Sequence, residues 1–181
     1  MTTTTAGGRQ VAERAGDSLD ERFRRLLEAN HAPLTRLAAS YAGNRSDRDD
    51  LLQEIAIAVW RALPSLRGDC SERTFLFRIA HNRCMTHLSK RRPTVSLDEA
   101  QIDVEDPNVS AETLLAEEQQ RRRFVQAIRG LPAIHREVLV LFLEGMDYGE
   151  IAAVVGISES NVGVRLNRAR QRLKELLEEG T

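Results

Sequence analysis

Apolar residues recur at steps of three and four along most of the chain, and no stretch alternates apolar and polar residues as a half-buried strand does. The pattern predicts an all-α fold, with helices over residues 18–30, 32–42, 46–63, 73–91, 111–129 and 132–144 and a final helical pair. Residues 93–110 lack this periodicity and contain two prolines. Two small helical domains are therefore expected, one on each side of that segment.

The final helical pair has the pattern of a helix-turn-helix. Asp147 and Glu150 are spaced as a capping box at the start of its first helix, and Gly156 ends that helix. Ser158 is placed to cap a second helix, whose apolar positions are Val162, Leu166, Ala169, Leu173 and Leu176. The other faces of this helix carry Arg and Asn, which can pair with base edges in a major groove. An ordinary amphipathic hairpin with a solvated basic face is the alternative.

Charge is distributed unevenly, although the net charge is only −1. Residues 1–92 carry 16 Lys and Arg against 11 Asp and Glu, residues 93–120 carry none against 8, and residues 121–181 carry 10 against 8. Two basic regions thus flank an acidic connector. We expect a disordered tail over 1–17, a first domain over 18–92, a flexible acidic linker over 93–110 and a second domain over 111–181.

Membrane, disulfide and metal proteins are disfavoured. No apolar run approaches the roughly 20 residues that cross a bilayer, and no signal peptide is evident, so a cytoplasmic protein is expected. Cys70 and Cys84 make no disulfide framework, and nothing in the sequence says that their sulfurs meet in a redox pair. His81, Cys84 and His87 are evenly spaced, but the two histidines point well apart on a helix and a fourth zinc ligand is not evident. We expect no metal, no cofactor and no catalytic residue.

Several short motifs occur in a characteristic order: Asp49-Asp-Leu-Leu-Gln-Glu54, Trp60-Arg-Ala-Leu63, Leu66-Arg-Gly68, Arg73-Thr-Phe-Leu-Phe-Arg-Ile-Ala-His-Asn82, Leu131-Pro132, Arg136-Glu-Val138 and Arg165-Leu-Asn-Arg-Ala-Arg170. From about Asp17 to Leu177 the chain resembles bacterial sigma factors of the extracytoplasmic-function (ECF) type. The resemblance implies two helical domains on a flexible linker that recruit core RNA polymerase, the first opening the promoter −10 element and the second reading the −35 element. It also implies an inhibitory anti-sigma factor as a partner, and no catalysis.

The implied polymerase-binding residues are Asp50, Leu51, Gln53 and Glu54. Helical spacing gathers their polar groups into one acidic and amide patch beside the leucine. By the resemblance, this patch binds the clamp helices of the polymerase's largest subunit. A solvated helix start, with acids favoured by the helix dipole, is the alternative. Trp60 has the spacing of a core residue rather than of a DNA-stacking group.

A loop over 66–72 precedes a basic helix, and eight cations stand against two acids between Arg61 and Arg92. Cations of this kind can follow phosphates of single-stranded DNA while a loop pocket holds a base turned out of the stack. The resemblance assigns the −10 non-template strand to Arg67, Arg73, Arg78, Asn82, Arg83, Lys90, Arg91 and Arg92. For the last three, a solvated face is the alternative.

The implied −35 residues are Ser160, Asn161, Gly163, Val164, Arg165, Asn167, Arg168 and Arg170. Asn161 stands where the family commonly has Thr, and Gly163 and Val164 replace a basic residue and a Ser. Gly163 weakens the helix by about 1 kcal/mol relative to Ala. The −35 sequence is therefore expected to differ from the family's usual one, with Asn161, Asn167 and Arg168 as candidate readers.

Two rival functions remain open at this point. One is a regulator that binds duplex DNA as a dimer through the helix-turn-helix and senses a signal with its N-terminal part. The other is an enzyme, for example a metal-dependent hydrolase using His81 and Cys84, although no Gly-rich phosphate loop or paired metal motif supports it. The acidic linker has two readings as well: a plain spacer, or a nucleic-acid mimic that enters the polymerase channel through which RNA passes.

Overall fold

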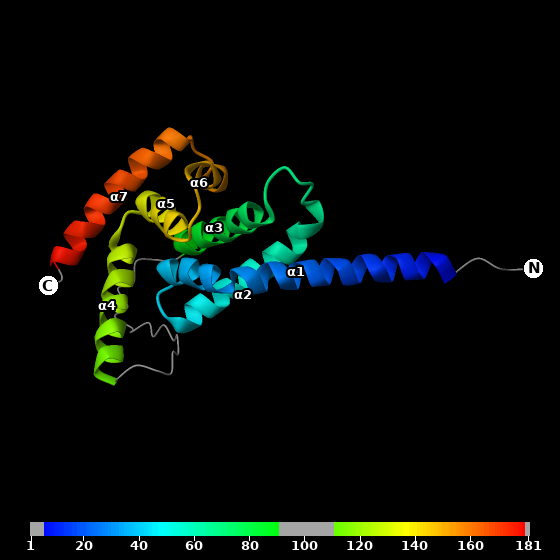
Figure 1. Ribbon diagram of the computed structural model, residues 1–181, viewed down its shortest axis with the longest axis horizontal. Coiled ribbons are helices and arrows are strands. Elements are labelled where there is room, and N and C mark those ends of the chain that lie inside the picture. The colour runs from blue at the N-terminus through cyan, green and yellow to red at the C-terminus, as the bar shows by residue number, and fades with distance from the viewer. Residues whose placement is uncertain (1–5, 91–110, 180–181) are drawn as a thin grey trace, which may run out of the picture.

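The computed structural model describes the backbone of residues 6–90 and 111–179 and the side chains of residues 19–90 and 118–178. Within these ranges the chain is helical, as predicted (Figure 1). The elements are α1 (Ala6–Tyr41), α2 (Arg45–Ala62), a short 3-10 turn (Leu63–Ser65), α3 (Glu72–Lys90), α4 (Ala111–Gly130), α5 (Ala133–Leu143), α6 (Tyr148–Val155) and α7 (Glu159–Glu179). The predicted acidic linker over 93–110, Arg91 and Arg92 lie outside the described residues.

The first helix, α1, is continuous where the sequence predicted two helices with a break near residue 31. Pro33 lies inside it and does not end it. The reason is tertiary packing: Leu26, Leu34 and Leu37 are buried along one stripe of the same helix, so a single helix buries more apolar surface than two would. The helix also begins at Ala6, so the structure places residues 6–17 in a helix where the sequence predicted a disordered tail.

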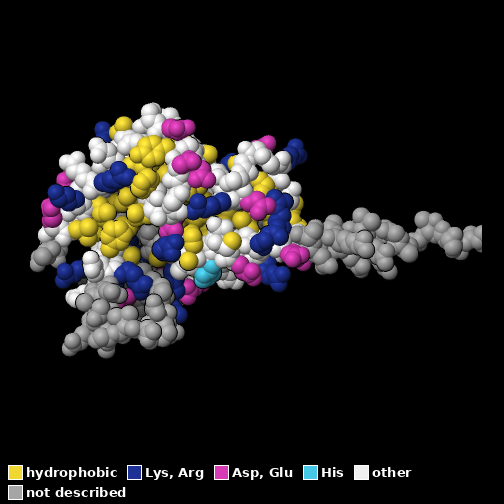
Figure 2. Space-filling model, in the orientation of Figure 1, with side chains coloured by type: hydrophobic (Ala, Val, Ile, Leu, Met, Phe, Trp, Pro, Cys, Tyr) yellow, Lys and Arg dark blue, Asp and Glu magenta, His cyan; other side chains and the backbone are white. Residues whose placement is uncertain are grey.

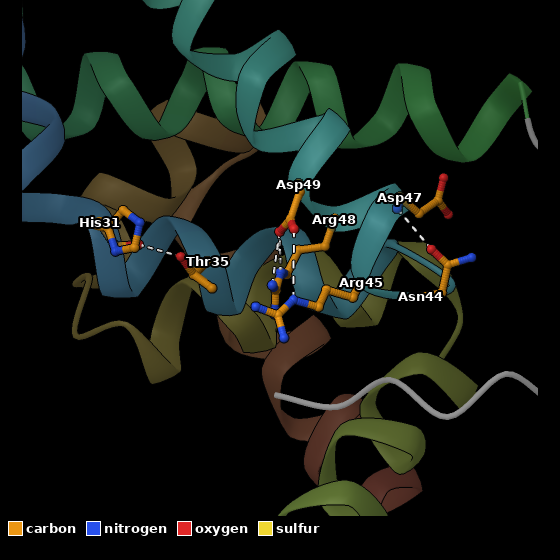
Figure 3. Close-up of polar contacts among 7 residues, drawn as sticks. All are labelled: His31, Thr35, Asn44, Arg45, Asp47, Arg48 and Asp49. Atoms are coloured by element: carbon orange, nitrogen blue, oxygen red, sulfur yellow. Dashed lines mark hydrogen bonds and ion pairs between the residues drawn. The ribbon is translucent and has the colours of Figure 1, made fainter. Parts of the chain in front are cut away.

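Helices α1, α2 and α3 pack on one another and form the first lobe. Asn44 caps α2, because its side chain accepts a hydrogen bond from the backbone N–H of Asp47 at 2.8 Å (Figure 3). Pro64 ends α2 in the 3-10 turn, as the sequence predicted. Phe77 on α3 and Leu51 on α2 are fully buried in this lobe's share of the core.

Helices α4 to α7 form the second lobe, in which α5 packs on α6 and α7, and α4 packs on α7. The two lobes also contact each other: α6 lies against α3, and α4 and α5 lie against α1 (Figure 1). Their buried apolar side chains form one continuous cluster. Among the residues that the structure describes, no helix is long and apolar enough to cross a membrane.

Candidate nucleic-acid interface

The helix-turn-helix is built as the sequence predicted. The Asp147 side chain accepts from the backbone N–H of Glu150 at 2.8 Å, and the Glu150 side chain accepts from the backbone N–H of Asp147 at 3.0 Å. This complete capping box starts α6. Gly156 ends α6 with φ at +79°, a left-handed conformation that glycine adopts without steric cost. The Ser158 hydroxyl accepts from the backbone N–H of Asn161 at 3.3 Å and caps α7.

The second helix of the motif, α7, has one buried and one exposed face. Val162, Leu166 and Ala169 are fully buried, as their spacing predicted. The exposed face carries Ser160, Asn161, Val164, Asn167 and Arg168. Val164 is 50% exposed, although it is apolar. This face therefore offers amide, guanidinium and methyl groups, which are among the groups that distinguish base edges in a major groove.

Two arginines predicted to bind the −35 element also contact α5, and they differ in exposure: Arg165 is partly buried and Arg170 is exposed. Arg165 Nη1 lies 2.5 Å from Glu137 Oε1 of α5, and the two side chains are only 21% and 8% exposed. Arg170 stacks on Phe142, with its guanidinium carbon 4.8 Å from the ring centroid. Arg165 in particular is an anchor between α7 and α5, because breaking this pair would leave a nearly buried carboxylate.

His135 of α5 lies near the same helix. Burial lowers the pKa of its imidazole, and the positive charges of Arg168 and then Arg165 lower it further. Its Nδ1 is buried without a hydrogen-bond partner. A lowered pKa favours the neutral imidazole, which adds no third positive charge beside the two arginines.

The acidic and amide patch on α2 is exposed as predicted, apart from its leucine. Asp50, Gln53 and Glu54 point to solvent. Leu51 is 1% exposed, so it supports the patch from beneath and offers no contact surface. The neighbouring Asp49 is engaged with Arg48 at 2.9 Å and with Arg45 at 4.0 Å (Figure 3). Among the residues that the structure describes, the acceptors of the patch have no partner, whereas the neighbouring Asp49 is already paired.

Trp60 is not a core residue, which corrects the prediction made from its spacing. It is 38% exposed and meets Phe23 of α1 edge to face, with ring centroids 5.1 Å apart. Ile57, one turn earlier, is 45% exposed. Both lie on the helical stripe that contains Gln53 and Glu54, because steps of three and four residues return to the same face. The sequence analysis missed this apolar continuation of the patch.

The basic helix α3 carries an exposed polar stripe. Arg78, Asn82, Arg83 and Lys90 are exposed, as is Arg67 in the preceding loop. Arg73 differs: it is half-buried, donates to the backbone carbonyl of Glu144 in the second lobe, and lies over the Phe77 ring. On the face that Figure 2 shows, Lys and Arg side chains are spread over both lobes. The exposed polar residues of α3 are spaced along the helix, which fits a track that follows a strand rather than one anion-binding pocket.

His81 and Cys84, the residues of the zinc and enzyme hypotheses, are both buried. His81 Nε2 lies 3.1 Å from Glu137 Oε2. Burial raises the pKa of the Cys84 thiol to about 12, so its reactive thiolate is scarce at neutral pH. In the part of the chain that the structure describes, no three His, Cys, Asp or Glu side chains gather as a metal site.

Two family models match the chain: Sigma-70 region 2 over residues 26–94 and Sigma-70, region 4 over residues 121–173. The ECF RNA polymerase sigma factor SigM of Mycobacterium tuberculosis strain H37Rv is 32% identical over 172 residues, covering 92% of this chain and 82% of SigM. The solved structure of CnrH in complex with the cytosolic domain of CnrY superposes with a TM-score of 0.67 at 29% identity, covering 96% of this chain and 98% of that one. The sigma factor RpoE in complex with the anti-sigma factor NepR from Bartonella quintana shares the fold, with a TM-score of 0.70 at 24% identity over 87% of this chain and 98% of that one.

Proposed function

The chain belongs to the family of ECF RNA polymerase sigma factors, and on that premise we propose that it binds core RNA polymerase and directs initiation at a limited set of promoters. The observation that carries the proposal is the exposed stripe on α2. A rigid helix presents Asp50, Gln53 and Glu54 without partners among the described residues, followed by exposed Ile57 and Trp60. A polar half beside an apolar half is the composition of a protein-binding surface.

The polar half supplies hydrogen-bond acceptors and charge, which fix orientation and discriminate between partners. Removing the surface of the apolar half from water stabilises a complex. Tryptophan, the residue type at position 60, is enriched among the energetic hot spots of interfaces. We infer that both halves face the polymerase, the first through its clamp helices. The contact thus extends one to two turns beyond the residues that the sequence pattern indicated.

Two DNA functions follow from the remaining surfaces. The exposed stripe of α3, with Arg67 and the preceding loop, meets the non-template strand of the −10 element. The exposed face of α7 enters the major groove of the −35 element, where Asn167 and Arg168 contact base edges and Val164 contacts a thymine methyl group. Arg165 holds the helix in place through Glu137 rather than reading bases, whereas Arg170 stacks on Phe142 and keeps its exposed N–H groups available to phosphate.

We propose that the protein acts in the cytoplasm, together with the polymerase, as an initiation factor. It contributes no catalysis of its own. An inhibitory anti-sigma factor is the further partner that we propose. A relative at 29% identity, CnrH, was solved with the cytosolic domain of a second protein, CnrY, bound to it, which supports a protein partner for this chain.

The experiment is a promoter-dependent transcription assay with core RNA polymerase, paired with co-elution on a sizing column. Wild-type chain should co-elute with core enzyme and direct transcripts from specific start sites. Replacing Asp50, Gln53 and Glu54 together by Ala should weaken core binding at least about 30-fold, since a hot-spot cluster contributes about 2 kcal/mol or more. The helical signal in circular dichroism should not change, because these side chains are exposed.

A matched control removes three exposed polar side chains from α1 instead: Asp20, Glu21 and Glu28. This variant should bind core enzyme as the wild type does. Equal loss in both variants would show a general effect of charge, and retained co-elution of the α2 variant would contradict the assignment of the patch.

A further inference from the structure

One segment of α1 contacts both ends of the connection between α2 and α3. Phe23 meets Trp60, near the end of α2, edge to face with ring centroids 5.1 Å apart. The neighbouring Arg22 binds Glu72, the first residue of α3, with Nε 2.6 Å from Oε1. Residues 63–71 run between these two points of attachment. We call the ion pair of Arg22 and Glu72 the brace.

The loop over residues 66–71 is ordered at its two ends. At its start, Leu66 is partly buried against the core, and its N–H donates to the carbonyl of the fully buried Leu63 at 3.2 Å. At its end, the Ser71 hydroxyl accepts from the backbone N–H of Thr74 at 3.0 Å, which is the pattern of a helix N-cap. Thr74 is itself buried. Both ends are thus fixed by buried side chains and local hydrogen bonds.

The tip of this loop is exposed. Arg67, Gly68 and Asp69 all lie at the surface. Gly68 has a φ of +89° and nothing within 4 Å of the place where a Cβ would stand, so the backbone conformation requires glycine here and the available space does not. The next residue, Cys70, accepts a hydrogen bond on Sγ from Arg78 Nη2 at 3.2 Å. This contact joins the tip to the exposed stripe of α3.

The brace adds a contact from a second helix at the place where α3 begins. Its two side chains are 33% and 41% exposed, so the pair contributes little to the overall stability of the fold. Its effect on geometry is more specific, because a charge-assisted hydrogen bond is short and directional. The pair fixes the position of the first turn of α3 relative to α1, and Ser71 and the loop are attached to that turn.

We propose that Arg22 is a positioning residue for the −10 strand, which acts through Glu72 to hold the loop in its binding conformation before DNA arrives. This proposal rests on the function proposed above. A loop that must hold an unstacked base loses conformational entropy on binding, and this cost falls when the loop is already ordered. Affinity for the −10 strand therefore scales with the fraction of chains in which the loop is formed.

The first test measures the order of the loop without DNA or polymerase. Arg22→Glu puts a carboxylate against Glu72, and amide hydrogen exchange of the full chain is followed in a peptide that covers residues 64–75. Exchange there should become about twofold to fivefold faster, which corresponds to the loss of one partly exposed ion pair. Exchange in α5 and α7 should not change, because the brace joins α1 to α3.

The matched control is Arg24→Glu, which makes the same change of charge at an exposed position of α1. Residues two positions apart on a helix do not share a face, so this carboxylate points away from Glu72. Exchange in the loop should remain as in the wild type.

A charge exchange completes the first test. Arg22→Glu combined with Glu72→Arg restores opposite charges and should return the exchange rate toward wild type. Equal exchange in the Arg22 and Arg24 variants, or an exchanged pair whose loop is as loose as that of the single Arg22 variant, would overturn the brace.

The second test measures binding of the −10 strand by the holoenzyme formed with core polymerase. The probe is a fluorescein-labelled single strand that carries the non-template −10 sequence of a promoter mapped by the transcription assay above. Arg22→Glu should weaken its binding by the same factor that the exchange measurement gives, since both report the fraction of formed loop. Affinities for core polymerase and for the −35 duplex should not change, and Arg24→Glu should bind the strand as the wild type does. An equal loss of affinity for core polymerase would show a general structural effect and contradict the positioning role.

The two proposals fail in different ways. If the proposed function is wrong, wild-type holoenzyme makes no start-specific transcripts, and the positioning role is wrong with it even where the brace orders the loop. If the brace is wrong, transcription is intact and the Arg22 and Arg24 variants behave alike in both tests.

Discussion

Replacing Arg165 and Arg168 one at a time separates the two roles that arginine plays on α7. Both lie in the basic motif near the chain's end, and the resemblance to sigma factors implies a −35 contact for both. In the structure Arg165 is bound to Glu137 at 2.5 Å, whereas Arg168 is exposed. Arg165→Ala should therefore reduce stability, and Arg168→Ala should reduce DNA binding.

The magnitude for Arg165 follows from the burial of its partner. The Glu137 side chain is 8% exposed, so the substitution leaves a nearly buried carboxylate with His81 as its remaining partner. Removing one member of such a pair costs about 2–4 kcal/mol of the free energy of unfolding. Combining Arg165→Ala with Glu137→Gln should cost less than the sum of the two single changes, because the second change removes the stranded charge.

The magnitude for Arg168 follows from its exposure. The change should alter the free energy of unfolding by less than about 0.5 kcal/mol, as at most surface positions. If the guanidinium pairs with a base edge, binding to the −35 duplex should weaken by about 1–3 kcal/mol, with relaxed preference at one base pair. A phosphate contact would instead weaken all sequences about equally.

The assay pairs urea unfolding with fluorescence anisotropy on a panel of single-base −35 variants at one fixed salt concentration, because salt alone shifts such affinities strongly. Unchanged stability of the Arg165 variant, together with relaxed preference at one base pair, would refute the division of roles. Loss of stability in the Arg168 variant would refute it equally.

Two further substitutions and one labelling experiment test other details. Gly163→Ala should raise the free energy of unfolding by about 0.5–1 kcal/mol in urea denaturation, because alanine favours a helix more than glycine does. The added Cβ has room, since it would lie 3.5 Å from the Tyr148 ring, an ordinary contact distance. The pKa of His135 in the folded chain lies below the value of about 6.5 in an unfolded chain, so the unfolded chain takes up the proton first as pH falls. The free energy of unfolding should therefore decrease below about pH 6.5. His135→Gln should flatten that part of a plot of stability against pH. Cys70 should react with a thiol reagent in the native chain while Cys84 reacts only on unfolding, because Cys84 is buried and its pKa is raised to about 12.

Local signals in the sequence predicted the helix-turn-helix almost residue by residue. A capping box needs only Asp147 and Glu150 three positions apart, and a left-handed helix end needs a glycine such as Gly156. The burial of Val162 and Leu166 follows from helical periodicity on one short helix. These features depend on neighbours within one turn, so the chain's order of residues is enough to specify them.

Features that depend on distant segments were predicted less well. Pro33 favours a helix end locally, yet burial of leucines before and after it keeps α1 continuous. Trp60 has core spacing on α2, but it stays 38% exposed although the Phe23 ring of α1 meets it edge to face. In both cases the outcome is decided by what packs against the residue, which periodicity along a single helix does not contain.

The arginines show most clearly that contacts with distant segments cannot be predicted from the pattern along one helix. Their contacts also affect how the protein can bind DNA. A count of cations treats every arginine as available to phosphates, but Arg73, Arg129 and Arg136 donate to backbone carbonyls, and Arg165 binds a carboxylate. These guanidinium groups stabilise helix ends and lobe contacts by the same hydrogen bonds with which they would bind phosphate. The cationic surface available to DNA is therefore smaller than the number of arginines in the sequence indicates, because the fold already uses these four guanidinium groups.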